Sequence, residues 1–281
     1  MTVSSIALEG KRNMPPLDAH AAQYRSTRDD RLLPGASERS AVAVAALPSG
    51  APWAFHDRAA VQPQVPSYMQ EVYAWAYLWP ISVRLLDRPQ VVNAILWGNY
   101  PRLLRAALAE LRPGQRVYQP ACVYGNFSSK VAEALGPDGQ LDVGDVAPVQ
   151  VENCRRKLSA YDNVRVHLWN AADKRPGFYD VVCCFFLLHE IPESYKYRVV
   201  DTLLQTVPPG GKVVFVDYHG PHWAHPLKWL MSFVNDTLEP FAKALWVNEI
   251  ASYSSLANEF SWSKQTYFWG LYQKVVAVRK S

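Results

Sequence analysis

The spacing of hydrophobic and polar positions changes near residue 114. Between residues 68 and 111 the apolar residues recur at helical intervals, and prolines at positions 80, 89 and 101 interrupt them. Because proline marks helix boundaries, this spacing predicts short amphipathic helices over residues 66–113. After Pro113-Gly114, short apolar runs alternate with helical segments, a pattern typical of a parallel sheet with helices on both faces.

The alternating part of the chain predicts an α/β fold with a doubly wound, mostly parallel, seven-stranded sheet of Rossmann-like type. Strands are expected over residues 116–119, 140–145, 164–167, 179–187, 212–217, 264–269 and 271–279. Helices are expected over residues 128–135, 149–158 and 197–206. We therefore divide the chain into a disordered leader over residues 1–65, rich in Ala, Ser, Pro and Arg, a helical aromatic lid over 66–113, and the sheet domain over 114–281.

Composition excludes several classes of protein. Of the 281 residues, 49% are hydrophobic and only 19% are charged, which excludes a wholly disordered chain. The net charge of +4 is too small for a nucleic-acid binder. No apolar run is long enough to span a bilayer. The four cysteines form neither metal-ligand pairs nor a disulfide framework, so a reducing compartment is expected.

The positive charge is concentrated in one segment. Residues 84–116 contain six arginines against Asp87 and Glu110, which accounts for the whole excess. Next to the aromatic segment, these arginines favour peripheral attachment to anionic lipid, although the solvated face of an Arg-rich helix would give the same pattern. The sequence leaves the oligomeric state open.

Loops that follow the predicted strands are the places to look for chemistry, because doubly wound sheets bind ligands at the carboxyl ends of their strands. Five such loops occur here, at Gln119–Asn126, Asp145–Pro148, Asn170–Asp173, Leu187–Pro192 and Asp217. In order and spacing they resemble the class I S-adenosylmethionine-dependent methyltransferases over residues 114–281.

This resemblance implies that S-adenosylmethionine is the cofactor. The ribose hydroxyls would bind Asp145, and Asn170 with Ala171 would edge the adenine. The implied cofactor-binding residues are Gln119, Ala121, Val123, Tyr124, Gly125, Asp145, Val146, Asn170, Ala171 and Phe186.

The first of these loops departs from the family pattern of an acid followed by three alternating glycines. Gln119 replaces the acid, Val123 replaces the second glycine, and only Gly125 is retained. Because a β-branched side chain disfavours positive φ, we expect either weakened cofactor affinity or a different placement of the methionine end.

That altered loop, read with the N-terminal aromatic region, resembles a narrower family, the rhodoquinone biosynthesis proteins of the RquA type, from about Pro66 to the C-terminus. The supporting stretches are Ile95–Tyr100, Ala121–Gly125, Cys183–Pro192 and Asp217–His219. The resemblance implies conversion of ubiquinone to rhodoquinone, in which an amino group replaces a ring methoxy group. It also implies S-adenosylmethionine as the amino donor, assistance by a divalent metal such as Mn²⁺, and a location in the bacterial cytoplasm at the inner face of the cytoplasmic membrane.

Such chemistry needs a neutral amine, a base and an electrophile. Gln119 in place of an acid suits an amine that must react, since a carboxylate would hold it as ammonium. The candidate catalytic residues are Asp217, His189 and Tyr124, and the candidate metal ligands are Asp217, Glu190 and His219. The histidines after residue 217 match no zinc signature and could equally belong to a surface loop, and His189 could be a structural histidine at a strand end.

A lipid quinone also needs an apolar binding place. The candidate residues are Tyr73, Tyr77, Trp97, Tyr100, His219, His222 and Trp223, although helix-spaced aromatics are usually core. Two other functions stay open. The protein could be an ordinary methyltransferase acting on a quinol or another lipophilic aromatic, or a binding protein that has lost catalysis.

Overall fold

The structure, a computed structural model, describes residues 65–281. The leader predicted for residues 1–65 lies outside the described residues, apart from its last residue. Within residues 65–281 no helix is long and apolar enough to cross a membrane.

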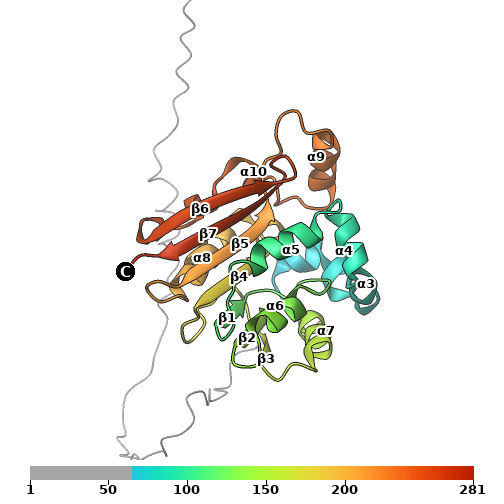
Figure 1. The fold of residues 1–281 in the computed structure, drawn as a ribbon. Coiled ribbons are helices and arrows are strands. Elements are labelled where there is room, and N and C mark those ends of the chain that lie inside the picture. The colour runs from blue at the N-terminus through green and yellow to red at the C-terminus, as the bar shows by residue number, and fades with distance from the viewer. Residues whose placement is uncertain (1–64) are drawn as a thin grey trace, which may run out of the picture. The chain divides into compact units, whose positions relative to one another are not determined.

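A seven-stranded mixed sheet forms the centre of the fold, with strand order β3-β2-β1-β4-β5-β7-β6 (Figure 1). Six strands are β1 (Arg116–Gln119), β2 (Gln140–Asp145), β3 (Val164–Leu168), β4 (Val181–Phe185), β5 (Lys212–Tyr218) and β6 (Phe260–Tyr267), and the seventh is β7 (Tyr272–Arg279). Only β7 runs antiparallel to its neighbours β5 and β6. This confirms the predicted fold class. The order reverses between β1 and β4, which is where such sheets bind ligands.

Alternating side chains of the central strands supply two cores, one on each face of the sheet. In β4, Val181, Cys183 and Phe185 belong to one buried cluster, and Val182 and Cys184 belong to the other. Because both faces of the sheet are covered, the sequence of β4 is apolar at every position and does not alternate between apolar and polar residues. The first cluster packs against α5 (Tyr100–Leu108), α6 (Phe127–Leu135) and α7 (Pro148–Leu158).

The second cluster packs against helices on the opposite face of the sheet. They are α8 (Glu193–Gln205), α10 (Ala244–Val247) and the 3₁₀ helix η4 (Ile250–Tyr253), and η5 (Ala257–Glu259) precedes β6. The helix predicted at 197–206 begins at Glu193 instead, directly after Pro192, with an acid in its first turn. The strand predicted at 179–187 ends at Phe185, because Phe186 has a φ of 52° and leaves the extended conformation.

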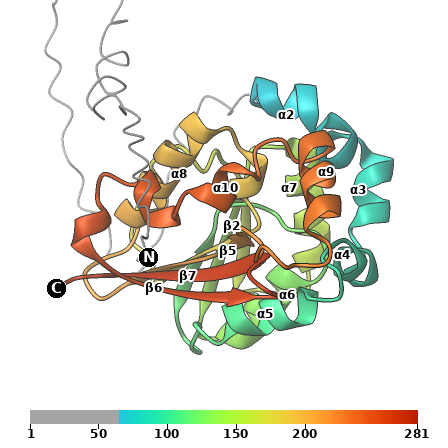
Figure 2. The ribbon, with the colours of Figure 1, turned by 90° about the horizontal axis from the view of Figure 1, so that it is seen from above.

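The described N-terminal segment consists of short helices, as the spacing predicts. They are α2 (Ser67–Val72), the π-helix η2 (Ala74–Leu78), α3 (Pro80–Leu86) and α4 (Pro89–Ile95). Proline stands in the first turn of α3, α4 and α5. These helices lie at the same end of the molecule as α9 (Lys228–Thr237), beyond the sheet (Figure 2). The sequence pattern did not predict the π-turn, a rare element that often occurs at functional sites.

Candidate active site

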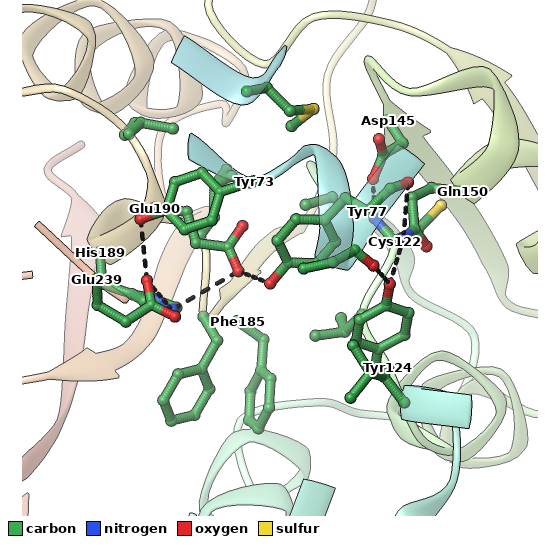
Figure 3. Close-up of a pocket in the computed structure, with 18 of the residues that line it drawn as sticks. Tyr73, Tyr77, Cys122, Tyr124, Asp145, Gln150, Phe185, His189, Glu190 and Glu239 are labelled. Carbon is green, nitrogen blue, oxygen red and sulfur yellow. Dashed lines mark hydrogen bonds and ion pairs between the residues drawn. The ribbon is translucent and has the colours of Figure 1, made fainter. Parts of the chain in front are cut away.

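A cavity of about 410 Å³ lies over the carboxyl ends of β1, β2 and β4 (Figure 3). Its other walls come from α2, η2, α4 and α9. Most of the residues proposed from the sequence line it. They are Tyr73, Tyr77, Trp97, Ala121, Val123, Tyr124, Asp145, Val146, Asn170, Ala171, Phe186, His189 and Glu190.

Several other proposed residues do not line the cavity. Asp217, Gln119, Gly125 and Tyr100 lie behind its wall, where Tyr100 donates a hydrogen bond to Asn126 Oδ1 at 2.9 Å. The structure does not bring His219, His222 or Trp223 to the cavity, because the segment after β5 turns outward.

The loop after β1 is held from inside by Gln119. Its Nε2 donates to the carbonyl of Ala121 at 2.6 Å and to Ser128 Oγ at 2.9 Å, and its Oε1 is buried without a partner in the described structure. Val123 is not among the residues with positive φ, so its β-branched side chain is compatible with the backbone of this loop, whereas Gly125 has a φ of 81°. A Cβ at Gly125 would come within 3.1 Å of Tyr100 Oη, so this glycine is needed for conformation and for space.

A buried ion pair ties the same loop to the N-terminal helices. Asp87, at the end of α3, accepts hydrogen bonds from the Gly125 amide, Asn153 Nδ2 and Lys157 Nζ, at 2.8, 2.7 and 2.7 Å. Lys157 Nζ also donates to the carbonyls of Val123 and Gly125. The side chains of α7 therefore fix the loop conformation together with Asp87.

Asp145 occupies the position expected for a ribose ligand. Its Oδ2 accepts the Cys122 amide and its Oδ1 accepts the Ala147 amide, both at 2.8 Å. Burial raises the pKa of Asp145 to about 6. Each carboxylate oxygen can accept a further hydrogen bond, so a vicinal diol can bind beside these amides. With Val146, Asn170 and Ala171 along the same wall, the donors and apolar surfaces fit the adenosine part of S-adenosylmethionine.

A histidine between carboxylates lies on the opposite side of the cavity. His189 Nδ1 lies 2.9 Å from Asp217 Oδ1, while Asp217 Oδ2 accepts the Leu188 amide at 2.8 Å. His189 Nε2 lies 3.6 Å from Glu190 Oε1 and 3.9 Å from Glu239 Oε2. Asp217 therefore orients the imidazole, and Nε2 faces two acids in the cavity wall (Figure 3).

Two tyrosines from the N-terminal segment complete this cluster. Tyr73 Oη donates to Glu239 Oε2 at 2.9 Å, and Tyr77 donates to Glu190. Tyr77 also stacks on Tyr124, with ring centroids 5.4 Å apart, so it joins the acidic cluster to the loop after β1. The N-terminal segment, the core and the α9–α10 connection thus each supply part of one polar cluster.

Burial and charge shift the protonation equilibria of this cluster. Burial lowers the pKa of His189, but the charge and hydrogen bond of Asp217, with Glu239 and Glu190, outweigh this and raise it to about 9. Burial raises the pKa of Glu190 to about 8, opposed by His189 and aided by Glu239. The cluster can therefore hold or release protons near neutral pH, as acid–base catalysis requires.

The three proposed metal ligands do not come together. His219 Nδ1 lies 2.8 Å from the Gly270 carbonyl and Nε2 lies 3.4 Å from Lys264 Nζ, away from Glu190. Both oxygens of Asp217 already bind His189 or backbone amides. Within residues 65–281 no group of three or more His, Cys, Asp or Glu side chains could hold a metal ion. The metal set Asp217, Glu190 and His219 is thus corrected, because the loop after β5 carries His219 out of reach.

Some lining residues were not proposed from the sequence. The main ones are Gln150, Trp169 and Glu239. Gln150 Nε2 donates to Tyr124 Oη at 2.8 Å. Gln150, Asn153 and Lys157 are polar residues at helical spacing, so they lie on the same side of α7. That polar stripe on a buried face was a usable signal. Glu239, in contrast, stands alone between Leu238 and Pro240, and no motif marks it.

Comparison with known proteins agrees with this geometry. Residues 117–211 match the family model described as "Methyltransferase domain". The match covers about a third of the chain. The Ubiquinone/menaquinone biosynthesis C-methyltransferase UbiE of Ectopseudomonas mendocina is 28% identical over 180 residues, which is 59% of this chain and 67% of that protein. The protein of the same name from Haemophilus ducreyi is 26% identical over 152 residues, which is 52% of this chain and 58% of that one.

Solved structures show the same fold. An O-methyltransferase family protein from Burkholderia thailandensis matches with a TM-score of 0.54 at 17% identity, over 69% of this chain and 60% of that one. A possible exported protein from Bordetella parapertussis matches with a TM-score of 0.53 at 20% identity, over 71% of this chain and 72% of that one. The chain therefore has the fold of S-adenosylmethionine-dependent methyltransferases, with homologues in quinone biosynthesis.

Proposed function

We propose that this protein binds S-adenosylmethionine and a lipophilic quinone in the same cavity and modifies the quinone ring. Asp145, Asn170 and Ala171 would hold the adenosine part, as argued from their place in the wall. The aromatic side chains of Tyr77 and Tyr124 offer flat surfaces to a quinone ring between the adenosine wall and the acidic cluster. The similarity to UbiE proteins, which are named for ubiquinone and menaquinone biosynthesis, supports a quinone as the substrate.

The proposed reaction is replacement of a ring methoxy group of ubiquinone by an amino group, which gives rhodoquinone. S-Adenosylmethionine would be the amino donor. The observation that supports this proposal is the loop after β1. There Gln119 replaces the usual acid, and its Nε2 donates hydrogen bonds to the Ala121 carbonyl and Ser128 Oγ. Without a carboxylate there, an amine near the loop is not held as ammonium and can act as a nucleophile.

The polar cluster would supply the acid–base chemistry. A carbon–nitrogen bond forms at the ring carbon that carries the methoxy group, and the carbon–oxygen bond breaks so that methanol leaves. One proton passes from the amine to the departing oxygen in this step. His189, oriented by Asp217, with Glu190 at its Nε2, would move that proton. In a second step the bond between the transferred nitrogen and the Cα of the co-substrate would break. A base of the cluster would take a proton from Cβ, the rest of the co-substrate would leave as an alkene, and the nitrogen would take up a proton to become the amino group. Within residues 65–281 the side chains do not form a metal site, and no step is derived through a metal.

Methyl transfer to the ring of a quinol is the second candidate. The relatives at 26–28% identity favour it, because their names describe C-methyltransferases. In that reaction His189 or Glu190 would take a proton from the ring hydroxyl or the ring carbon. The two reactions consume different parts of the same co-substrate, so labelling separates them.

The test uses the purified full chain, ubiquinone with a short tail, and S-adenosylmethionine labelled with ¹⁵N on its α-amine, with and without Mn²⁺. A parallel reaction uses a short-tailed quinol that has one unsubstituted ring carbon, because the ring of ubiquinone has none to methylate. Mass spectrometry then identifies the quinone product. ¹⁵N in a quinone that has lost one methoxy group supports amino transfer. A product with one added methyl and no ¹⁵N, from the quinol, contradicts amino transfer and supports methyl transfer.

A matched variant shows that the cavity performs the chemistry. His189→Gln should abolish the product while calorimetry still detects S-adenosylmethionine binding, because Asp145 is untouched. Asp217→Asn should reduce turnover less than His189→Gln, since it only reorients the imidazole. Unchanged turnover in His189→Gln would refute the role given to the cluster.

A further inference from the structure

Exposed tryptophans are concentrated at one end of the protein. Within residues 65–281, six tryptophan side chains are exposed, and they are Trp75, Trp79, Trp97, Trp223, Trp229 and Trp269. They belong to η2 and its C-terminal flank, the end of α4, α9, and two adjoining segments, 219–227 and 268–271. The others described, Trp169, Trp246 and Trp262, are half-buried.

Further large apolar side chains are exposed on the same elements. These are Ile81 and Leu85 of α3, Ile95 at the end of α4, and Phe233 and Leu238 in and after α9. We call the eleven residues together the tryptophan rim: Trp75, Trp79, Ile81, Leu85, Ile95, Trp97, Trp223, Trp229, Phe233, Leu238 and Trp269. Only four other large apolar side chains in the described part are exposed, and they lie on other elements.

The rim surrounds one side of the cavity. Trp75, Ile95, Trp97 and Leu238 are exposed and also line the cavity, so the rim is continuous with its apolar wall. Trp97 Nε1 donates to Met231 Sδ at 3.1 Å, which joins α4 to α9 at this point. In both views of the ribbon α3, α4 and α9 lie at the same end of the molecule (Figures 1 and 2).

Helix α9 has an unusual distribution of apolar residues for a surface helix. Met231 and Val234 point to the cavity, while Trp229 and Phe233, four residues apart, are exposed on the outside. A surface helix normally turns its outer side to water with polar residues. Tryptophan and phenylalanine on the outer side are typical of a helix that lies in the interface of a lipid bilayer.

Charge around the rim matches an anionic surface. Arg84 and Arg88, flanking Leu85, and Lys228, before Trp229, are all exposed. The two acids on the same elements are compensated, since Asp87 pairs with Lys157 and Asp236 pairs with Lys243. The exposed apolar side chains of the rim are therefore flanked by cations that pair with no acid in the described part of the chain, the combination that anionic bilayers attract.

We propose that the tryptophan rim docks the protein on an anionic lipid bilayer, with α9 and α3 in the interface and the cavity opening toward the lipid. This deepens the proposed function, because a quinone with an isoprenoid tail would enter directly from the bilayer. The docking itself depends only on the rim. It therefore holds whichever group is transferred.

Vesicle cosedimentation of the full chain tests the proposal. We expect binding to vesicles of phosphatidylglycerol and phosphatidylethanolamine, and weaker binding to phosphatidylcholine alone. The double variant Trp229→Ser with Phe233→Ser should lower the partition coefficient at least about tenfold, because each ring contributes buried apolar area. Both residues lie outside the cavity wall, so turnover of a short-tailed quinone in solution should not change.

Matched controls separate the rim from other exposed surfaces. Tyr197→Ser with Val247→Ser removes two exposed apolar side chains elsewhere and should leave partitioning unchanged. Arg84→Gln with Arg88→Gln should weaken binding to anionic vesicles only. Unchanged binding in the rim variant, or no binding by the wild type, would overturn the proposal.

A second copy of the chain is the competing occupant of the rim. Sedimentation velocity without lipid decides this point. A monomeric wild type agrees with the proposal. A dimer that the rim variant dissociates would overturn it. The labelling experiment above uses a short-tailed quinone in solution, so failure of amino transfer and failure of docking are distinguishable.

Discussion

The buried ion pair between Asp87 and Lys157 gives the sharpest test of how the loop after β1 is held. The Asp87 side chain is 6% exposed and the Lys157 side chain 20%. In Asp87→Asn, Oδ1 can still accept from the Gly125 amide and from Lys157 Nζ, but the Nδ2 that replaces Oδ2 cannot accept from Asn153, and the negative charge is lost. The variant thus leaves a cation facing the loop without its counter-charge.

The expected loss of stability follows from these contacts. Removing one partner of a buried ion pair typically costs about 3–5 kcal/mol. Lys157 keeps the carbonyls of Val123 and Gly125 and some solvent, so the cost should be lower, about 2–3 kcal/mol. For a protein of this size that corresponds to a fall in Tm of roughly 4–12 °C.

Differential scanning calorimetry measures this fall, with Asp138→Asn as the control because Asp138 is exposed. S-Adenosylmethionine binding by titration calorimetry should weaken in Asp87→Asn, since the loop loses its anchor. The double variant Asp87→Leu with Lys157→Met should recover part of the lost stability, because neither buried charge remains. A Tm for Asp87→Asn within about 1 °C of wild type would refute the assigned role of the pair.

Two further predictions concern the polar cluster. Asp217→Asn should lower the pKa of His189 from about 9 by at least about one unit. NMR titration measures this pKa, and the His189 imidazole signal is identified as the one that His189→Gln removes. An unchanged pKa would contradict the assigned contact. Since folded Glu190 keeps its proton up to about pH 8 whereas an unfolded glutamate releases it near its usual 4.5, the free energy of unfolding should fall as pH rises between these values. Denaturant unfolding at a series of pH values should show a shallower fall in Glu190→Gln, and parallel profiles would count against the raised pKa.

The fold could be predicted from the sequence because the strands carry their own signal. The apolar run around β4 exists because both sheet faces are covered, and Gly270 marks the turn between β6 and β7. The end of β4 was missed because positive φ at Phe186 is imposed by packing against His189 and Tyr218, not by local preference.

Residues at strand ends could also be placed in advance. Parallel strands bring the loops at their carboxyl ends together, so Asp145, Asn170 and His189 had to be near one another once the strands were assigned. Residues from the connections between elements follow no such rule. Glu239 reaches His189 only because the segment after α9 folds back, whereas the loop after β5 carries His219 away from the cavity.

The basic segment shows why a linear charge pattern can suggest a membrane face but cannot locate one in the fold. Arg84 and Arg88 lie next to the tryptophan rim residue Leu85 in the chain. Arg116, in contrast, begins β1, whose opposite end meets the cavity, and its guanidinium lies 5.4 Å from the Tyr179 ring centroid. The arginines of residues 84–116 therefore do not share one face. The rest of the proposed docking surface comes from α9 and its flanking segments, which lie more than a hundred residues after Arg84 in the chain. The proposed docking surface consists of two distant segments joined through Trp97 and Met231, so it depends on the arrangement of α4 and α9. If the proposal holds, lipid contact and cavity shape should be coupled.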